Sequence, residues 1–477
     1  MHRLKFAYIV SGIFIVIILA SLSCSNVHDN KQEQKIEQEV LKKEILSDEE
    51  EIQLASIFTA KKVDEIDALL KIYRKRFRFH GNVLVAYHGM LIYNRSFGIA
   101  DFTTNRVMDI NDRFQLASVS KQFTSTAIML LAQEGKLDIS DTVQRIIPEF
   151  PYERVTIEQL LHHTAGMPNY MWLLEHKWEK GRKAYNSDII RLMKENNTSL
   201  YFRPGRRYEY SNTGYAVLAY IVEKVSGIPF ADFVQQRIFD PLNMNNSFVY
   251  SNASENDYPM HLQGHYRRWK HYNIIKETVH DGIVGDKGVY STTADLYKWD
   301  QSLYTNILLS DSMRNIAFTP VKVRGRYDYP YGYGFRLKKV NGKKVVYHTG
   351  LWEGFRTNLM RYVEDKNTII VLNHTNINVN NVMVKRIESI LAKPLEGSNA
   401  QAVVSVALKQ GEEKAFEYYN TVKQNNDFVD ITKILEAANV LSTMGKPQLS
   451  GVVIKLYEKI NATISLKERA ASIKNVV

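Results

Sequence analysis

The 477-residue sequence contains a single cysteine, Cys24. A disulfide needs two cysteines, so none can form within one chain, and the fold must be stabilised by its core alone. Hydrophobic residues make up 45% of the sequence. Roughly 340 residues between an N-terminal tether and a C-terminal tail are enough for a large core or two closely packed lobes.

Motifs for nucleic-acid binding and for metal binding are also missing. The net charge is +11. A basic protein that is exported, as the N-terminal segment described below predicts, meets anionic lipid or cell wall, so we expect no nucleic-acid partner. The histidines His261, His265, His271 and His280 have spacings that fit no short ligand motif, and the segment RRWK among them is cationic. We therefore expect no metal and no other cofactor.

The N-terminal segment predicts export. Arg3 and Lys5 precede an apolar run from Phe6 to Leu22, which ends just before Cys24. This pattern is typical of a bacterial lipoprotein signal, although Ser21 stands where leucine is usual. We expect residues 1–24 to be a signal peptide with Cys24 lipidated, which would anchor the chain to a bacterial membrane facing the periplasm or exterior. An uncleaved anchor helix is the alternative.

The rest of the chain divides by composition. Residues 25–55 are mostly polar and charged, which predicts a tether, and a helix is expected around 61–77. Residues 56–392 form the predicted main domain. Residues 398–477 form a predicted helical appendage, in which 435–460 are similar to one tetratricopeptide hairpin, although a single copy is weak evidence.

The main domain has strand patterns at both of its ends. Two β-rich runs over 82–101 are joined by His88-Gly89, and two more beyond residue 330 are joined by Asn341-Gly342. Helical patterns occupy most of the roughly 200 residues between them. The sequence therefore predicts an α+β fold, in which an antiparallel sheet flanked by helices carries a mostly helical insert.

Ser118 and Lys121 stand one helical turn apart at the start of an amphipathic pattern that ends near Gly135. A serine hydroxyl needs a base to become a nucleophile, and a desolvated lysine three residues later can act as one. The pKa of Lys121 would have to fall by about 3 from ~10.4. We predict that Ser118 is a nucleophile and Lys121 its base.

Two further stretches are candidates for the same site. Tyr210, Ser211 and Asn212 precede an apolar helix, where the tyrosine can relay a proton and the asparagine can bind a carbonyl. The same tripeptide recurs at 250–252 before a polar loop, and we favour the first copy because a helix start holds it rigid. The second stretch is residues 347–350, on a predicted inner strand. Here Thr349 can bond a carboxylate, and Gly350 would allow a ligand backbone to approach.

The serine–lysine pair, the Tyr-x-Asn motif and the triplet His348-Thr349-Gly350 occur in the order that resembles the penicillin-recognising serine hydrolases. Within them the chain is similar to the branch of class C β-lactamases, D-alanyl-D-alanine peptidases, D-aminopeptidases and carboxylesterases. The resemblance covers about residues 60–392 and includes the phrases LLHHTAGMP, FRPGRRYEYSNTGY and GDKGVYSTTADLYKW.

This resemblance implies an acylated Ser118, with Lys121 as base and Tyr210 as proton relay. It also implies substrate contacts from Asn212, His348, Thr349 and Gly350, and an oxyanion hole made by the N–H groups of Ser118 and Leu351. Class C β-lactamases carry lysine where this chain has His348. A neutral or switchable imidazole attracts a carboxylate less, so Arg356 could replace the missing charge or form a structural ion pair.

We therefore expect an exported serine hydrolase that acts on D-amino-acid peptides, small esters or amides, with β-lactams as further candidates. Its partners would be a small-molecule or peptidoglycan-derived peptide substrate and, through the lipid anchor, the membrane. The alternative is a catalytically silent penicillin-binding or cell-wall-sensing lipoprotein, although such a protein would be expected to lose Ser118 or Lys121. The sequence makes no prediction of the oligomeric state.

Overall fold

The computed structural model describes residues 41, 44–179, 182–250, 261–393, 399–425 and 427–464. The chain divides into two compact units, Lys61–Lys393 and a second made of Met1–Ala60 with Pro394–Val477. The predicted signal peptide, Cys24 and most of the predicted tether lie outside the described residues, as do Ser251 and Asn252 of the second Tyr-Ser-Asn copy. Within the described ranges, no helix has the length and apolarity needed to cross a membrane.

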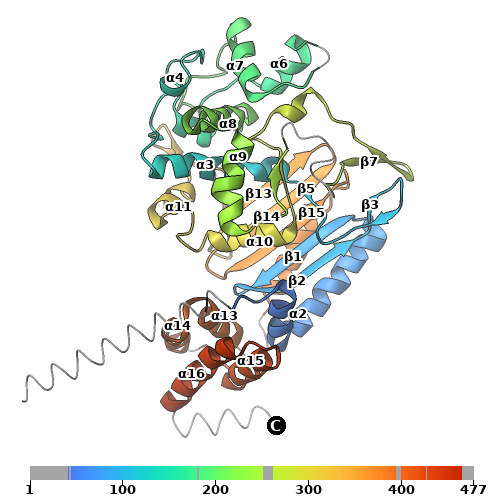
Figure 1. The fold of residues 1–477 in the computed structure, drawn as a ribbon, viewed down its shortest axis with the longest axis vertical. Coiled ribbons are helices and arrows are strands. Elements are labelled where there is room, and N and C mark those ends of the chain that lie inside the picture. The colour runs from blue at the N-terminus through green and yellow to red at the C-terminus, as the bar shows by residue number, and fades with distance from the viewer. Residues whose placement is uncertain are drawn as a thin grey trace, which may run out of the picture. The chain divides into compact units, whose positions relative to one another are not determined.

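A six-stranded sheet with the order β12-β13-β14-β15-β1-β2 forms the centre of the larger unit (Figure 1). All neighbouring strands are antiparallel, and β15 joins the two ends of the unit by pairing with β1. His88 and Asn341 have φ angles of 48° and 50°, as two-residue hairpin turns require. The predicted antiparallel sheet is confirmed. Its strands are β1 (Gly81–Tyr87), β2 (Met90–Phe97), β12 (Arg336–Val340), β13 (Lys343–Trp352), β14 (Phe355–Tyr362) and β15 (Asn367–Asn373).

Helices from the C-terminal end of the unit and from the insert pack on this sheet. α12 (Asn380–Leu391) contacts β14 and β15, and α10 (Thr293–Ser302) contacts β15 and β1. A fully buried ion pair ties α10 to the sheet, since Arg361 donates to Asp300 Oδ1 at 2.5 Å. The same carboxylate accepts a hydrogen bond from Thr368.

The long helix that precedes β1 is longer than predicted. α2 runs from Asp48 to Phe77, so residues 48–55 of the predicted tether are helical. Its start has a physical cause, because the Ser47 N–H donates to Glu50 and the Glu50 N–H donates to the Ser47 hydroxyl. This reciprocal capping satisfies two backbone donors of the first turn.

Helices account for most of the regular secondary structure of the insert between β2 and β12, as predicted. The side chains of Thr156 and Thr292 cap the N-termini of two of its helices, α5 (Ile157–Leu161) and α10. Its helices besides α10 are α3 (Lys121–Gln133), α4 (Val143–Ile146), α5 (Ile157–Leu161), α6 (Tyr170–Lys177), α7 (Asn186–Glu195), α8 (Asn212–Ser226), α9 (Phe230–Val234) and α11 (Asp311–Ala317). Its short strands are β3 (Ile99–Asp101), β4 (Arg106–Val107), β5 (Phe114–Gln115), β6 (Phe248–Val249), β7 (His265–Arg268), β8 (His271–Ile274), β9 (Val289–Ser291), β10 (Val321–Val323) and β11 (Tyr327–Tyr329).

The C-terminal residues form helices, as expected for the appendage. In the predicted hairpin, α15 and α16 approach closely because Ala437, Ala438 and Ser450 are small and buried, and the Ser450 hydroxyl donates to the Ala438 carbonyl at 2.8 Å. The helices are α13 (Ala400–Gln410), α14 (Glu412–Gln424), α15 (Ile431–Thr443) and α16 (Pro447–Thr463).

Candidate active site

Ser118 lies in a short 3₁₀ turn, η1 (Ala117–Ser120), which leads into α3. The regular helix therefore begins at Lys121, three residues later than predicted, but a 3₁₀ turn still places residues i and i+3 on one side. Ala117 has a φ of 50°, a left-handed conformation that costs an L-residue about 1–2 kcal/mol. Surrounding contacts hold it there, since Leu116 is bonded through its N–H to Val289 and through its carbonyl to Thr357.

Lys121 is fully buried and faces Ser118. Its Nζ lies 3.1 Å from Ser118 Oγ and 2.8 Å from both Asn212 Oδ1 and the Asp286 backbone oxygen. The last two atoms only accept hydrogen bonds, so they take two N–H groups of the amine. In the neutral amine the remaining position is a lone pair, and it faces the Ser118 hydroxyl. This is the arrangement that a general base requires.

Burial lowers the pKa of Lys121 from 10.5 to about 7, with Asp286 opposing the change and Arg336 adding to it. This agrees with the fall that the sequence argument required. The change corresponds to roughly 5 kcal/mol. A substantial fraction of Lys121 is therefore neutral near pH 7, which is the form that can accept the Ser118 proton.

Tyr210 and Asn212 are held rigidly at the start of α8. The Ser211 hydroxyl caps the helix by accepting from the Gly214 N–H, and the Ser211 N–H donates to His163 Nδ1 at 3.1 Å. Burial raises the pKa of Tyr210, more than the Ser118 hydroxyl and Arg336 lower it. Tyr210 is thus a neutral phenol at neutral pH, which can relay a proton but cannot be the base.

Asn212 can bind a substrate carbonyl because of its contact with Lys121. Its Oδ1 accepts a hydrogen bond from the Lys121 amine. The amide nitrogen then remains as a donor, which suits a carbonyl oxygen of a substrate.

His348 is fully buried and has a partner at each ring nitrogen. Its Nδ1 lies 2.7 Å from the Thr349 carbonyl oxygen and its Nε2 lies 3.1 Å from the Tyr331 hydroxyl. Burial, together with the charges of Lys121 and Arg336, holds the pKa of His348 well below 6.5. The sequence left a neutral or a switchable imidazole open, and the structure gives the neutral one.

The reason for glycine at position 350 differs from the prediction. A side chain there would lie 2.2 Å from the Leu116 carbonyl oxygen and 2.2 Å from Thr357 Oγ1. The close approach is therefore made by the chain's own backbone next to Ser118, not by a ligand. Gly350 lets β13 pack directly against the turn that carries the nucleophile.

Leu351 offers a backbone N–H at the edge of the sheet. The pairing of β13 with β12 reaches only to Tyr347, so residues 348–352 have no strand neighbour on that side within the described chain. The two-residue turn at Glu353-Gly354 makes Trp352 and Phe355 a hydrogen-bonded pair. In an antiparallel ladder the next pair, Leu351 and Arg356, is not hydrogen-bonded to each other, so its N–H groups point away from the partner strand. The Leu351 N–H consequently points to the uncovered edge, as an oxyanion donor must. Thr349 stands two residues earlier on the same strand, so its N–H points to the same edge.

Arg356 does not supply charge to this site. Its Nε donates to the Asn376 backbone oxygen at 3.2 Å. Neighbouring residues of a strand face opposite sides of the sheet, and Thr357, the next residue, is the one bonded to Leu116 beside the nucleophile. The predicted role of Arg356 at the substrate is therefore wrong, and its contact with the backbone is structural.

Arg336 is the cation that the sequence did not reveal. Its guanidinium lies 5.0 Å from the centroid of the Tyr210 ring, and its Nε is buried without a hydrogen-bond partner among the described residues. Its charge lowers the pKa of Lys121 and of His348. In the sequence Arg336 is only one of several cations on a hairpin strand, so no local signal distinguishes it.

Asp286 and Lys287 support the base and were also missed. They stand between Gly285 and Gly288, whose φ angles of 99° and 95° are left-handed. The Tyr170 hydroxyl donates to Asp286 Oδ2 at 2.9 Å and accepts from Lys287 Nζ at 3.1 Å. This buried network fixes the loop whose carbonyl binds Lys121. In the sequence, the signal that could have revealed them is a pair of charged residues flanked by glycines.

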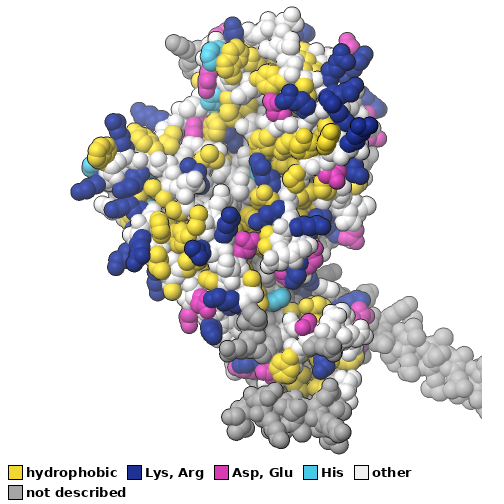
Figure 2. Space-filling model, turned by 180° about the vertical axis from the view of Figure 1, so that it is seen from behind, with side chains coloured by type: hydrophobic (Ala, Val, Ile, Leu, Met, Phe, Trp, Pro, Cys, Tyr) yellow, Lys and Arg dark blue, Asp and Glu magenta, His cyan; other side chains and the backbone are white. Residues whose placement is uncertain are grey.

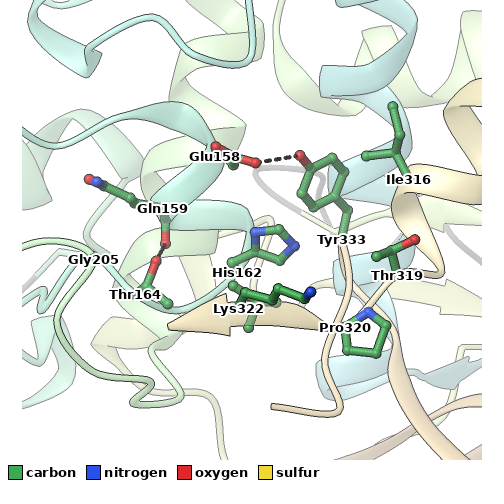
Figure 3. Close-up of a pocket in the computed structure, with 11 residues that line it drawn as sticks. Glu158, Gln159, His162, Thr164, Gly205, Ile316, Thr319, Pro320, Lys322 and Tyr333 are labelled. Carbon is green, nitrogen blue, oxygen red and sulfur yellow. Dashed lines mark hydrogen bonds between the residues drawn. The ribbon is translucent and has the colours of Figure 1, made fainter. Parts of the chain in front are cut away.

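A separate cavity of about 420 Å³ lies beside the supporting residues of the site and not at Ser118 (Figure 3). His162 and Tyr333 project into it, and the Tyr333 hydroxyl donates to Glu158 at 3.3 Å. His162 precedes His163, whose ring lies 4.3 Å from that of Tyr210. The lining residues are Glu158, Gln159, His162, Thr164, Gly205, Ile316, Thr319, Pro320, Val321, Lys322 and Tyr333.

Comparisons with known proteins identify relatives of this chain. The family model described as Beta-lactamase matches residues 67–391. Penicillin-binding protein 4* of Bacillus subtilis (strain 168) is 37% identical over 324 residues, which cover 65% of this chain and 71% of that protein. A D-aminopeptidase of Brucella anthropi is 24% identical over 297 residues, covering 61% of this chain and 55% of that protein.

Solved structures share the fold. A penicillin-binding protein from Bacillus halodurans superposes with a TM-score of 0.59 at 24% identity, covering 68% of this chain and 98% of that one. A D-amino acid amidase from Ochrobactrum anthropi SV3 gives a TM-score of 0.59 at 19% identity, covering 69% and 98%.

Proposed function

Because this chain belongs to the beta-lactamase family, whose members are serine hydrolases, we propose that it hydrolyses small acyl donors through an acyl-enzyme on Ser118. The observation that carries the proposal is the contact set of Lys121. Its amine is buried between two fixed acceptors and the Ser118 hydroxyl.

The proposed reaction has two halves. Neutral Lys121 takes the Ser118 proton while Oγ bonds to the substrate carbonyl carbon, and the N–H groups of Ser118 and Leu351 stabilise the resulting oxyanion. The bond to the leaving amine or alcohol then breaks, and Tyr210 relays a proton to that group. Water attacks the acyl-enzyme in the second half, and Ser118 regains its proton as the acid is released.

For the acyl donor we propose D-amino-acid peptides, amides or small esters, with β-lactams as further candidates. The names of the D-aminopeptidase and amidase relatives support the first group. The Arg336 guanidinium beside Tyr210, whose Nε is buried without a hydrogen-bond partner among the described residues, supports donors that carry a carboxylate. Steady-state hydrolysis of D- and L-alanine amides, a D-alanyl dipeptide, a neutral ester and a penicillin tests the proposal, and equal rates for D- and L-amides would contradict the D-preference.

Arg336→Gln should reduce acylation by a carboxylate-bearing donor such as penicillin about tenfold or more, relative to a neutral ester. A charge-assisted hydrogen bond contributes about 1.5–3 kcal/mol, and glutamine keeps only part of it. The comparison of the two donors cancels the effect of Arg336 on the pKa of Lys121, which both donors share. Arg356→Gln is the matched control and should change the ratio little. Equal losses for both donors would place Arg336 outside substrate recognition.

We also propose that the chain is exported and anchored by a lipid on Cys24. Support comes from the charged start, the apolar run from Phe6 to Leu22 and the cysteine that follows it. Cys24→Ala should abolish incorporation of radiolabelled palmitate and release the protein from the membrane fraction or block its processing. Unchanged incorporation and fractionation would contradict the lipid anchor.

A further inference from the structure

The β7–β8 hairpin carries an exposed aromatic residue at its tip. β7 and β8 pair from His265–Ile274 to Arg268–His271, which leaves Trp269 and Lys270 as the turn. The Trp269 side chain is 84% exposed. Its φ of 57° is left-handed, which is an unusual conformation for a bulky residue. An indole this exposed gains little packing energy to offset the cost of that conformation. Tyr266 and Ile274 are also exposed, each at 41%.

The base of the hairpin is firmly attached to the larger unit. The Tyr272 ring stacks on Phe102 with centroids 3.9 Å apart. The His265 N–H donates to the His374 carbonyl at 2.8 Å, and the Arg267 N–H donates to Asn376 Oδ1 at 2.9 Å. The tip is therefore presented on a fixed support, so its exposed indole is a stable feature of the surface.

Positive charge surrounds this tip. Arg267, Arg268, Lys270 and Lys276 lie on the hairpin or next to it, and within the described ranges none of them forms an ion pair with a carboxylate. Arg74 and Arg78 lie near enough to lower the pKa of Tyr272, after burial has raised it. The hairpin projects at the left edge of Figure 2, where Lys and Arg side chains gather around hydrophobic ones.

We propose that the tip of the β7–β8 hairpin docks on an anionic lipid bilayer, with Trp269 in the interfacial region and the surrounding cations at the lipid headgroups. Tryptophan is favoured at the boundary between headgroups and acyl chains, and each nearby Lys or Arg adds about 1 kcal/mol on an anionic surface. A soluble polyanion would need the cations but not the exposed indole. The indole therefore favours a membrane over a cell-wall polymer.

Docking here would bring the bilayer close to the candidate active site. The backbone of His265 packs on Gly354, where an added side chain would lie 2.6 Å from the His265 carbonyl oxygen. Gly354 belongs to the turn that ends β13, three residues after Leu351. The hairpin would thus select acyl donors at a membrane surface, but the docking itself does not rest on the proposed hydrolase function.

An environment-sensitive fluorophore at position 269 tests the inference. The full chain with Cys24→Ala and Trp269→Cys is labelled with NBD and mixed with vesicles of phosphatidylglycerol and phosphatidylcholine in equal parts. We expect a blue shift and a rise in emission that high salt reverses and that phosphatidylcholine alone does not produce. The matched control carries the label at Ile307→Cys, which is 61% exposed elsewhere on the larger unit, and should not respond.

Charge removal and a soluble polyanion complete the test. Adding Arg268→Gln or Lys270→Gln to the labelled chain should each raise the vesicle concentration needed for a half-maximal response about fivefold. An unchanged melting temperature is the folding control. Both labelled chains carry the same N-terminal residues, so a response confined to position 269 belongs to the hairpin. No response at 269, equal responses at 269 and 307, or an equal blue shift with polyphosphate in the absence of vesicles would overturn membrane docking.

Discussion

Replacing Ser118 by alanine should lower covalent labelling by acyl donors at least about a thousandfold, because nothing else in the site can form the ester. The melting temperature should stay within about 2 °C of the parent value. The Ser118 hydroxyl is hydrogen-bonded to the Lys121 amine, and the backbone of the turn is fixed by Leu116. Labelling by a fluorophosphonate and a thermal melt measure the two effects.

Ser120→Ala is the matched control for this variant. The Ser120 hydroxyl is buried and accepts from the Val289 N–H at 3.1 Å. Its loss leaves a buried donor unsatisfied, which should cost about 1–3 kcal/mol of folding stability while labelling persists. Labelling that survives in Ser118→Ala would move the nucleophile to another residue.

Lys121→Arg should lower acylation about a thousandfold or more, because a guanidinium stays charged and cannot take the serine proton. In the parent protein the acylation rate should rise with pH around a midpoint near 7, where Lys121 loses its proton. Below that midpoint the rate should fall about tenfold per pH unit. Stopped-flow acylation by a neutral ester between pH 5 and 9 measures the profile.

The same pKa makes a prediction about stability. The folded state depresses the pKa of Lys121 from 10.5 to about 7, so between these values the unfolded chain binds the proton and the folded chain does not. The Lys121 contribution to stability therefore improves as pH rises through this window, and below about pH 7 the folded state must bury a charge. Lys121→Met should remove this pH dependence and also be inactive, which keeps the test informative if arginine does not fit. A rate profile without a transition near neutrality would contradict Lys121 as the base.

Features that depend on local sequence were predictable. Ser118 and Lys121 were predicted because three residues of separation place them together in any helical turn, and Tyr210 and Asn212 because they stand at the start of a capped helix. The hairpins at His88-Gly89 and Asn341-Gly342 were found because their turns demand left-handed residues. The early start of α2 was missed because its first four residues, 48–51, are all acidic, although Ser47 and Glu50 are spaced as a capping box.

Features that depend on tertiary packing were not predictable. The contact of Arg336 with Tyr210 joins residues more than 120 positions apart, one on β12 and the other just before α8. The contact of His348 with Tyr331 forms because the β12–β13 hairpin folds the chain back on itself. The sequence predicted a close approach of a ligand backbone at Gly350, but only the fold shows that the Leu116 carbonyl lies there.

Intact-mass spectrometry after incubation with a fluorophosphonate, a penicillin and short acyl esters tests the acyl-enzyme directly. We predict a single adduct with the mass of one acyl or phosphonyl group, located on the peptide that contains Ser118 and absent from Ser118→Ala. With turnover substrates the acyl adduct should appear and then decay, whereas a silent binding protein would retain it. The absence of any adduct on Ser118 in folded protein, or an adduct of equal yield in Ser118→Ala, would contradict the proposed acyl-enzyme.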